Sequence, residues 1–398
     1  MLSKKWIVFA QDLARESRSY RKFFHAMKTD STISLYAYSM KRFMDFLHNE
    51  RHIDDPSDYD ELLDFDTEKI TDILEDFVYH LNSTQKPKGV TTILAGPELF
   101  FEMNRKIWHK KLVRKSIKKD DMESGGKVPI STEEIKTMLE YAKHPRDKAL
   151  VHFLASTGAR PAGLHDPILR VKHLAYMPNP NNPNQEQNWC YAVKIYDESK
   201  EGYWTFLTPE ATLALNRYFG WRKHIRKEEF DDETPIFATF SRSAKDKHLG
   251  MHGMKQIFRN LINRSNLQRI KKGNRYDKAQ NYMFRKRFNT ILKLNNDVNS
   301  NIAEKLMAHK RGLDGTYLQP TKEECYREFV KAIPQLTIDP TERQKADLEE
   351  KQEKIDQLEA TVQENSKLKQ KLDAQEDRVT KLEEMLFDSN FHPLSKSS

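Results

Sequence analysis

The sequence predicts a mainly α-helical protein with a small β-sheet, an α+β fold, followed by a C-terminal coiled coil. Apolar residues recur at helical spacing through much of residues 20–119. Two short β-prone runs, 189–196 and 203–207, flank a six-residue turn, which predicts a hairpin. Beyond residue 341 apolar residues repeat every seven positions, as coiled coils require.

The pattern divides the chain into five segments. Residues 1–119 are expected to form a helical domain and 120–129 a linker. Residues 130–340 form a second, α+β domain, 341–388 the coiled coil, and 389–398 a disordered tail. In the coiled coil the heptads before and after Asn365–Leu368 are out of phase by three residues. A single solvated charged helix remains the alternative for this segment.

In the first domain, residues 20–60 have a helical pattern. Ser31 or Thr32 is expected to cap the helix that follows. A second helix is predicted over Glu68–Leu81, then a turn-rich gap, then a third helix from about Pro97 to Lys119.

The third helix ends in a basic run that contains no acidic residue. A solvated helix face and a polyanion-binding surface both explain such a run, and repulsion among like charges favours the polyanion. The basic residues of this run are Arg105, Lys106, Lys110, Lys111, Arg114, Lys115, Lys118 and Lys119.

Capping signals predict where the helices of the second domain begin and end. Ser131 with Glu134 forms a capping box, and Gly158 can end a helix over residues 146–156 in a left-handed conformation. The sequence T-G-A-R-P therefore puts Arg160 on a tight turn just after a buried helix.

Further along, Thr208 caps a helix with Pro209 in its first turn. Thr321 with Glu324 forms another capping box, for a helix that ends near Ile333.

Charge and composition narrow the class of protein. Lys and Arg number 67 against 59 Asp and Glu, a formal net charge of +8. Residues 341–398 carry ten basic and fourteen acidic residues, a net of −4, so the remaining chain carries about +12. Residues 255–293 alone hold twelve basic residues and a single acid, Asp277. A basic body of this kind predicts a polyanionic partner.

Several classes are excluded. No run of 18 apolar residues occurs, which excludes a membrane-spanning helix. The N-terminal apolar run of five residues is too short for a signal-peptide core. Cys190 and Cys325 are the only cysteines, which excludes a disulfide framework and a cysteine-based zinc site. No phosphate-binding glycine motif appears, which argues against a nucleotide-driven motor protein. We therefore expect an intracellular protein, cytoplasmic and associated with the nucleoid.

Six polar residues lie where predicted helices or strands begin or end. Such residue types suit one reaction, the cutting of a phosphodiester by a tyrosine hydroxyl. Two guanidiniums can hold the equatorial oxygens of the transition state, and a lysine can protonate the leaving 5′-oxygen. The six residues are Arg160, Lys200, Tyr282, Arg285, His309 and Tyr317.

These residues carry a resemblance to a known family. S-T-G-A-R-P at 156–161, Lys200 between two short strands, Y-x-x-R-K at 282–286, A-H-K at 308–310 and then Tyr317 together resemble the tyrosine recombinases, or phage integrases. The Y-x-x-R form followed by R-F-N-T is similar to archaeal plasmid-type integrases, which belong to mobile genetic elements. The resemblance in residues covers about 129–335. Over 20–120 only the arrangement is alike, a helical and basic domain that precedes a linker.

The resemblance implies a catalytic domain at 130–340 and a core-binding domain before it. It implies that Arg160 and Arg285 clamp the phosphate, Lys200 is the general acid, and Tyr317 is the nucleophile. Tyr282 stands in the place of the usual histidine, and His309 matches the late histidine or tryptophan. The family cuts and rejoins duplex DNA without metal or ATP, so no cofactor is expected.

The resemblance also implies partners. Double-stranded DNA is the expected substrate, with a tetramer on two sites, and the coiled coil is expected to add self-association. No membrane partner is expected. The expected DNA contacts are Arg105, Lys106, Lys110, Lys111, Arg114, Lys115, Lys118, Lys271, Lys272 and Lys286.

Three positions depart from the family pattern. The acidic residue usual three places after the first arginine is Gly163, with His165 or Asp166 as replacements. Tyr282 cannot take up a proton as imidazole does, and the spacing from His309 to Tyr317 is one residue short. Two alternatives remain: a non-catalytic DNA-bridging protein dimerised by its coiled coil, and a DNA-relaxing enzyme like type IB topoisomerases.

Overall fold

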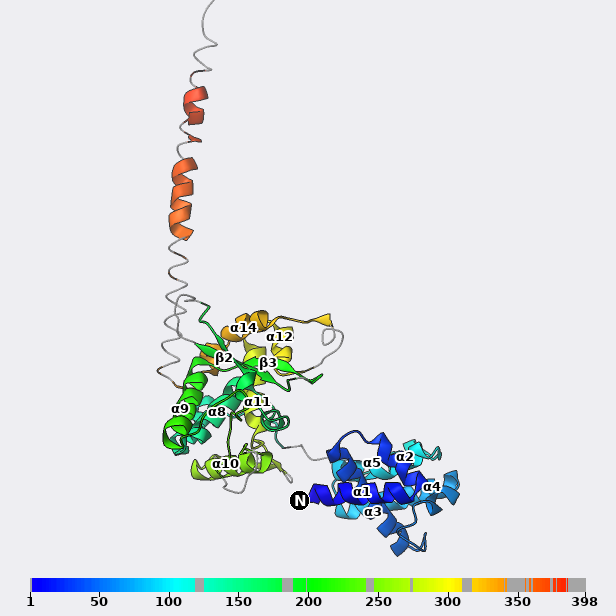
Figure 1. The fold of residues 1–398 in the computed structure, drawn as a ribbon. Helices are drawn as coiled ribbons and strands as arrows, with labels where there is room; N and C mark the ends of the chain where they lie inside the picture. Colours follow the sequence, from blue (N-terminus) through cyan, green and yellow to red (C-terminus); the bar gives the residue numbers. More distant parts are fainter. Residues whose placement is uncertain are drawn as a thin grey trace, which may run out of the picture. The chain divides into compact units, whose positions relative to one another are not determined.

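The protein is described here from a computed structural model (Figure 1). The chain divides into two compact units, Met1–Glu123 and Ser124–Ser398, and the boundary falls within the linker expected at 120–129. Both units are mainly helical, and the second contains a small antiparallel sheet, which confirms the α+β class. The structure describes residues 2–118, 125–180, 189–197, 199–240, 247–272, 275–309, 317–339, 341, 355, 358, 361–372, 375–376, 378–383 and 385.

The first unit is a set of helices around an aromatic core. Phe43 lies edge-on to Phe77 and Phe101, and Phe23 lies edge-on to Phe100, at centroid separations of 5.1 to 6.2 Å. Its elements are α1 (Leu2–Glu16), α2 (Arg18–Ala26), α3 (Asp30–Asn49), η1 (Glu61–Asp64), α4 (Thr67–Thr84), α5 (Pro87–Met103) and α6 (Lys110–Lys115).

Three expectations for this unit are wrong. The cap of α3 is Thr29, whose hydroxyl accepts the backbone N–H of Thr32, so the helix begins before Ser31. The single helix expected from Pro97 to Lys119 is two helices. Arg105 has a φ of 60°, which a continuous helix cannot contain, and the chain turns before α6.

The helix α5 also begins ten residues earlier than expected, at Pro87. A proline is favourable there because the first turn needs no N–H from it. Pro97 then lies inside the helix rather than at its start.

The second unit is built around a three-stranded antiparallel sheet in the order β1-β2-β3. The strands β2 and β3 form the predicted hairpin, with Ile195 opposite Tyr203 and Lys194 opposite Trp204. The strand β1, which pairs with β2, was not predicted. The strands are β1 (Leu174–Met177), β2 (Cys190–Ile195), β3 (Tyr203–Phe206), and a separate pair, β4 (Lys271–Lys272) and β5 (Arg275–Tyr276).

Three helices of this unit begin where the capping signals predicted. The capping boxes at Ser131 and Thr321 are both formed, and Thr208 caps α9. The helical elements are α7 (Thr132–Tyr141), α8 (Pro145–Thr157), η2 (Pro161–Leu164), η3 (Val171–His173), α9 (Pro209–Ile225), α10 (Met251–Arg264), α11 (Tyr282–Leu294), α12 (Ser300–Lys305), α14 (Lys322–Val330) and α15 (Ile333–Leu336).

Both faces of the sheet are buried. Alternate residues of a strand point to opposite faces, and those of β2 divide accordingly between two clusters. Val193 and Ile195 join the core around α8, α9 and α10, whereas Cys190 and Ala192 join the core around α12 and α14. Figure 1 shows these helices on opposite sides of β2 and β3.

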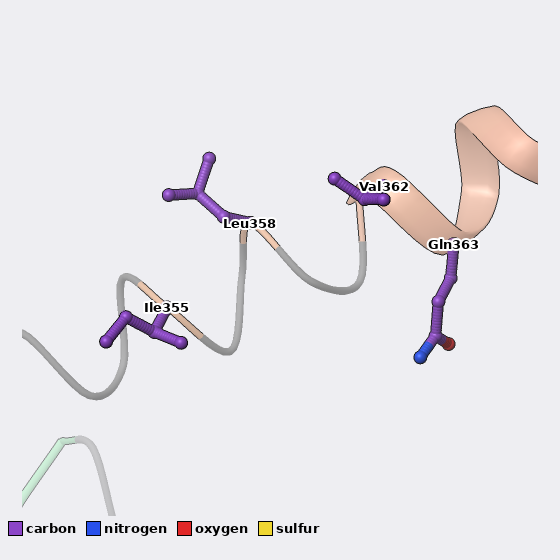
Figure 2. A pocket seen from close by; sticks show the side chains of 4 residues that line it. All are labelled: Ile355, Leu358, Val362 and Gln363. Carbon is purple, nitrogen blue, oxygen red and sulfur yellow. The ribbon is translucent and has the colours of Figure 1, made fainter.

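The described tail residues are helical and leave an apolar stripe uncovered. Ile355, Leu358 and Val362 line a shallow hollow, with Val362 66% exposed (Figure 2). Figure 2 shows Gln363 pointing away from Leu358 and Val362. The expected tail at 389–398 lies outside the described residues. In the described part of the chain, no helix is both long and apolar enough to cross a bilayer.

Candidate active site

The turn that follows α8 places Arg160 at the surface of the second unit. Gly158 has a φ of 57°, as predicted, and its N–H bonds to the carbonyl of Leu154. A Cβ on Gly158 would lie 2.5 Å from Cδ1 of Phe288, so the packing also requires glycine. Two residues later, half-buried Arg160 precedes η2.

Arg285 joins three separate parts of the unit. It lies in the first turn of α11 and is only 7% exposed. Its Nη1 donates to the carbonyl of Gly158 at 2.8 Å, and its Nη2 donates to the carbonyl of Met307 at 2.6 Å. The same Nη2 is 2.7 Å from Nε2 of His309. These contacts fix the guanidinium before any ligand arrives.

Two like charges gather at this point. Burial lowers the pKa of Arg285, and the positive charge of Arg160 lowers it further. The hydroxyls of Tyr203 and Tyr282 act in the opposite sense. Neighbouring cations with so little compensating charge form a site for an anion.

Tyr282 lies one turn before Arg285 on α11 and is 51% exposed. Residues three apart on a helix share a face, so the phenol stands beside the guanidinium at the mouth of the site. A phenol hydroxyl there can donate a hydrogen bond to an anion, but it cannot accept a full proton as an imidazole does.

Two further tyrosines belong to this site, and the sequence analysis missed both. Burial raises the pKa of Tyr203 to about 12, partly offset by Arg285 and Arg160. Burial also raises the pKa of Tyr196, against the opposing charges of Arg160 and Arg285. The alternation along β2 and β3 could have placed Tyr203 on the Arg285 face, but nothing local singles out Tyr196.

The β2–β3 hairpin occupies the space beside Gly163, where the family pattern has an acidic side chain. A Cβ built on Gly163 would lie 2.7 Å from Cγ2 of Ile195 and 3.3 Å from Cζ of Tyr196. The space that an acidic side chain would enter is therefore filled by the hairpin. Asp166, one of the two suggested replacements, acts electrostatically on Tyr196.

Lys200 and Tyr317 form no ion pair with this cluster in the described part of the chain. Lys200 is exposed in the β2–β3 turn, as predicted. Tyr317 is 79% exposed and lines a hollow of about 610 Å³ with residues of α12 and α14. Among the described residues, no hydrogen bond joins either side chain to Arg160, Arg285 or His309. The segment 310–316, between His309 and Tyr317, is outside the described residues.

Lys194, another lysine of the β2–β3 hairpin, faces the other side of the sheet. Its Nζ lies 4.9 Å from the centre of the Trp204 ring, and Trp204 packs against the core around α14. Ile195 and Tyr203, the neighbouring pair, face the Arg285 side. Lys194 therefore lies on the face of the sheet away from Arg285.

A basic groove of about 520 Å³ adjoins Tyr282. Four cationic side chains and no carboxylate stand among its described lining residues. Burial and the charge of Lys127 lower the pKa of Lys286. Lys271 and Lys272 form the exposed strand β4 beside this groove. The four cations are Arg269, Arg275, Lys278 and Lys286.

In the first unit, part of the basic run is already paired. Arg114 makes two hydrogen bonds, of 2.9 and 2.7 Å, to the buried carboxylate of Glu98. Lys110 bonds to Glu102 at 2.6 Å. The Nζ of Lys106 also has a partner, since it donates a hydrogen bond to the backbone carbonyl of Leu63.

The remaining described lysines of the run, Lys111, Lys115 and Lys118, are exposed, and Lys119 lies outside the described residues. The side chains of the three exposed lysines form no ion pair with any described residue. Arg105 is exposed as well, at the turn before α6. Within the described ranges, no cluster of three His, Cys, Asp or Glu side chains could hold a metal ion.

No family model and no curated protein sequence matches the chain. Among solved structures, the chain is similar to the XerH site-specific recombinase bound to its difH substrate, at 15% identity and a TM-score of 0.47, covering 71% of this chain and 74% of that one. It is also similar to a lambda integrase dimer bound to a COC′ core site, at 12% identity and a TM-score of 0.43, covering 80% of this chain and 97% of that one. A third similar structure is the XerA recombinase, at 16% identity and a TM-score of 0.35, covering 78% of this chain and 96% of that one.

Proposed function

We propose that the protein is a site-specific DNA recombinase, an integrase of the tyrosine recombinase family. The proposed reaction cleaves and rejoins DNA through a 3′-phosphotyrosyl intermediate. The observation that carries the proposal is the convergence of Arg285 and Arg160 beside His309, because this is the apparatus that a phosphodiester transition state needs.

The proposed steps balance without an oxidant or a cofactor. The Tyr317 hydroxyl gives up its proton to solvent as its oxygen attacks the phosphorus, a new phosphorus–oxygen bond forms, and the bond to the 5′-oxygen breaks. Lys200 gives a proton to that leaving oxygen. Arg160 and Arg285 hold the non-bridging oxygens, and the Tyr282 hydroxyl donates to one of them. Rejoining reverses these steps, so the phosphotyrosine conserves the bond energy.

The separation of Tyr317 from the arginines sets a requirement on this proposal. The Tyr317 hydroxyl must reach a phosphate that lies between Arg160 and Arg285, either from its own chain or from another copy on DNA. The same separation favours a second candidate, a protein that binds and bridges DNA without cutting it.

Duplex DNA is the proposed partner on both units. In the first unit, we assign backbone contacts to the exposed lysines of α6 and the turn after it, and in the second unit to the basic groove. A tetramer on two sites, with self-association through the tail, completes the proposal.

The test is a covalent trap. The protein is mixed with fragmented genomic DNA and with negatively supercoiled DNA, without metal or ATP. The mixture is quenched in detergent, and protein-linked DNA is recovered. We expect a few enriched sequences with the wild type, and none with Tyr317→Phe, whose binding affinity stays within about twofold because one hydroxyl is lost outside the phosphate contacts.

The other outcomes decide between the alternatives. Attachment by Tyr317→Phe would mean that another residue is the nucleophile. Attachment spread over all sequences and lost in the variant would favour a DNA-relaxing enzyme of the topoisomerase IB kind. Binding without any attachment would favour the bridging protein.

A further inference from the structure

Glu304 is a buried acid that the proposed chemistry does not use. It lies on α12, is 7% exposed, and is held by Nζ of Lys293 at 2.9 Å. Its other oxygen lies 2.6 Å from Nδ1 of His309. Burial alone would raise the pKa of Glu304, but the hydrogen bonds from Lys293 and His309 hold it below its usual value. The acid is therefore a carboxylate at neutral pH.

The two contacts of the His309 ring determine its proton. A carboxylate can only accept, so Nδ1 must carry a hydrogen and donate it to Glu304. On the other side, Nη2 of Arg285 can only donate, so Nε2 must be the acceptor. The ring is neutral, with its single proton on Nδ1. Burial lowers the pKa of His309, as do the charges of Arg285 and Arg160, against the opposing effect of Glu304.

We propose that Glu304 is a positioning residue for Arg285, acting through His309. The carboxylate selects the Nδ1–H form of the imidazole and so leaves Nε2 free to hold one arm of the guanidinium. The Met307 carbonyl accepts the second Nη2 hydrogen, and the Gly158 carbonyl accepts one Nη1 hydrogen. Lys293 holds the carboxylate in turn. The role of Arg285 toward a phosphate rests on the proposed function, whereas the orientation of the His309 ring does not.

The first experiment observes the ring itself, by ¹⁵N NMR of protein labelled at histidine, with His309→Gln used to assign the signal. We expect the wild type to show a neutral ring protonated on Nδ1. In Glu304→Gln the uniform tautomer is lost and the pKa of His309 falls, because the carboxylate that stabilised its cation is gone. A wild-type ring protonated on Nε2, or a Glu304→Gln spectrum identical to wild type, would overturn the proposal.

The matched control is Glu328→Gln. The side chain of Glu328 on α14 accepts a hydrogen bond of 2.6 Å from the backbone N–H of Asn299, the residue that caps α12. Glu328 also forms an ion pair with Lys331. It supports the same helix without touching His309, so its loss should leave the tautomer unchanged. A shift of equal size in Glu328→Gln would mean that general loosening of α12, and not the carboxylate at His309, produced the result.

A second experiment follows cleavage. Glu304→Gln should slow covalent attachment by about tenfold, by analogy with the loss that follows removal of the carboxylate partner of a metal-bound histidine. In a protein that already carries His309→Gln, adding Glu304→Gln should change the attachment rate by less than about twofold, because the histidine through which Glu304 acts is absent. Equal effects in both backgrounds would refute action through His309. If the wild type forms no attachment, the proposed function fails, and the NMR result still decides the role of Glu304.

Discussion

At the residue scale, the candidate site depends on one glycine more than on any charged side chain. Gly158 ends α8, provides a carbonyl for Arg285, and packs against Phe288. A single position thus joins the turn that presents Arg160 to the guanidinium of Arg285. Any side chain at this position would disturb both arginines.

Gly158→Ala should therefore lower the free energy of unfolding of the second unit by about 3 kcal/mol, from left-handed strain and the clash with Phe288 together. Gly220→Ala is the control. It lies in α9 with open space around a new Cβ, so it should be neutral or stabilise by about 0.5–1 kcal/mol. Urea unfolding measures both. Equal changes at the two glycines would contradict the packing argument.

At the scale of an element, α6 contains two kinds of basic residue. Arg114 and Lys110 face α5 and compensate its acids, so their charge serves the fold. Lys111 and Lys115 face solvent. Only the second kind offers charge to DNA phosphates at little cost to stability.

Lys111→Glu with Lys115→Glu should weaken DNA binding on all sequences and reduce the slope of log K against log salt by about 2. Lys22→Glu with Lys88→Glu makes the same change in net charge at two other exposed lysines of the unit. Binding measured by fluorescence anisotropy at several salt concentrations distinguishes them. An equal loss in both variants would indicate net charge alone and remove α6 from the interface.

At the scale of the whole molecule, the tail is a helix whose apolar stripe has no partner among the described residues. Leu372 is 56% exposed and Leu382 is 54% exposed. Side chains of this size at heptad spacing are stabilised by burial against another helix.

We expect Leu372→Glu with Leu382→Glu to reduce self-association as strongly as deletion of 341–398 does. Lys371→Glu with Lys381→Glu, at the neighbouring positions, should have a much smaller effect. Multi-angle light scattering gives the mass of each species. A wild type that is already monomeric, or an unchanged mass after deletion, would mean that the stripe binds a different partner.

Local features were predictable from the sequence because neighbours along the chain determine them. The capping boxes at Ser131 and Thr321, the left-handed Gly158 and the β2–β3 hairpin all depend on residues within a few positions of each other. The break at Arg105 was missed because no proline or glycine marks it.

Which residues meet was decided by packing between distant segments. Arg285 and Gly158 are 127 positions apart, and both reach the site only because α11 packs against α8. The same packing brings in Glu304 and Tyr196, which no motif singled out, and leaves Tyr317 in a different hollow. Residue types and local spacing therefore predict the chemistry available, while the tertiary contacts decide which groups can act together, because hydrogen bonds and charges act only over a few ångströms.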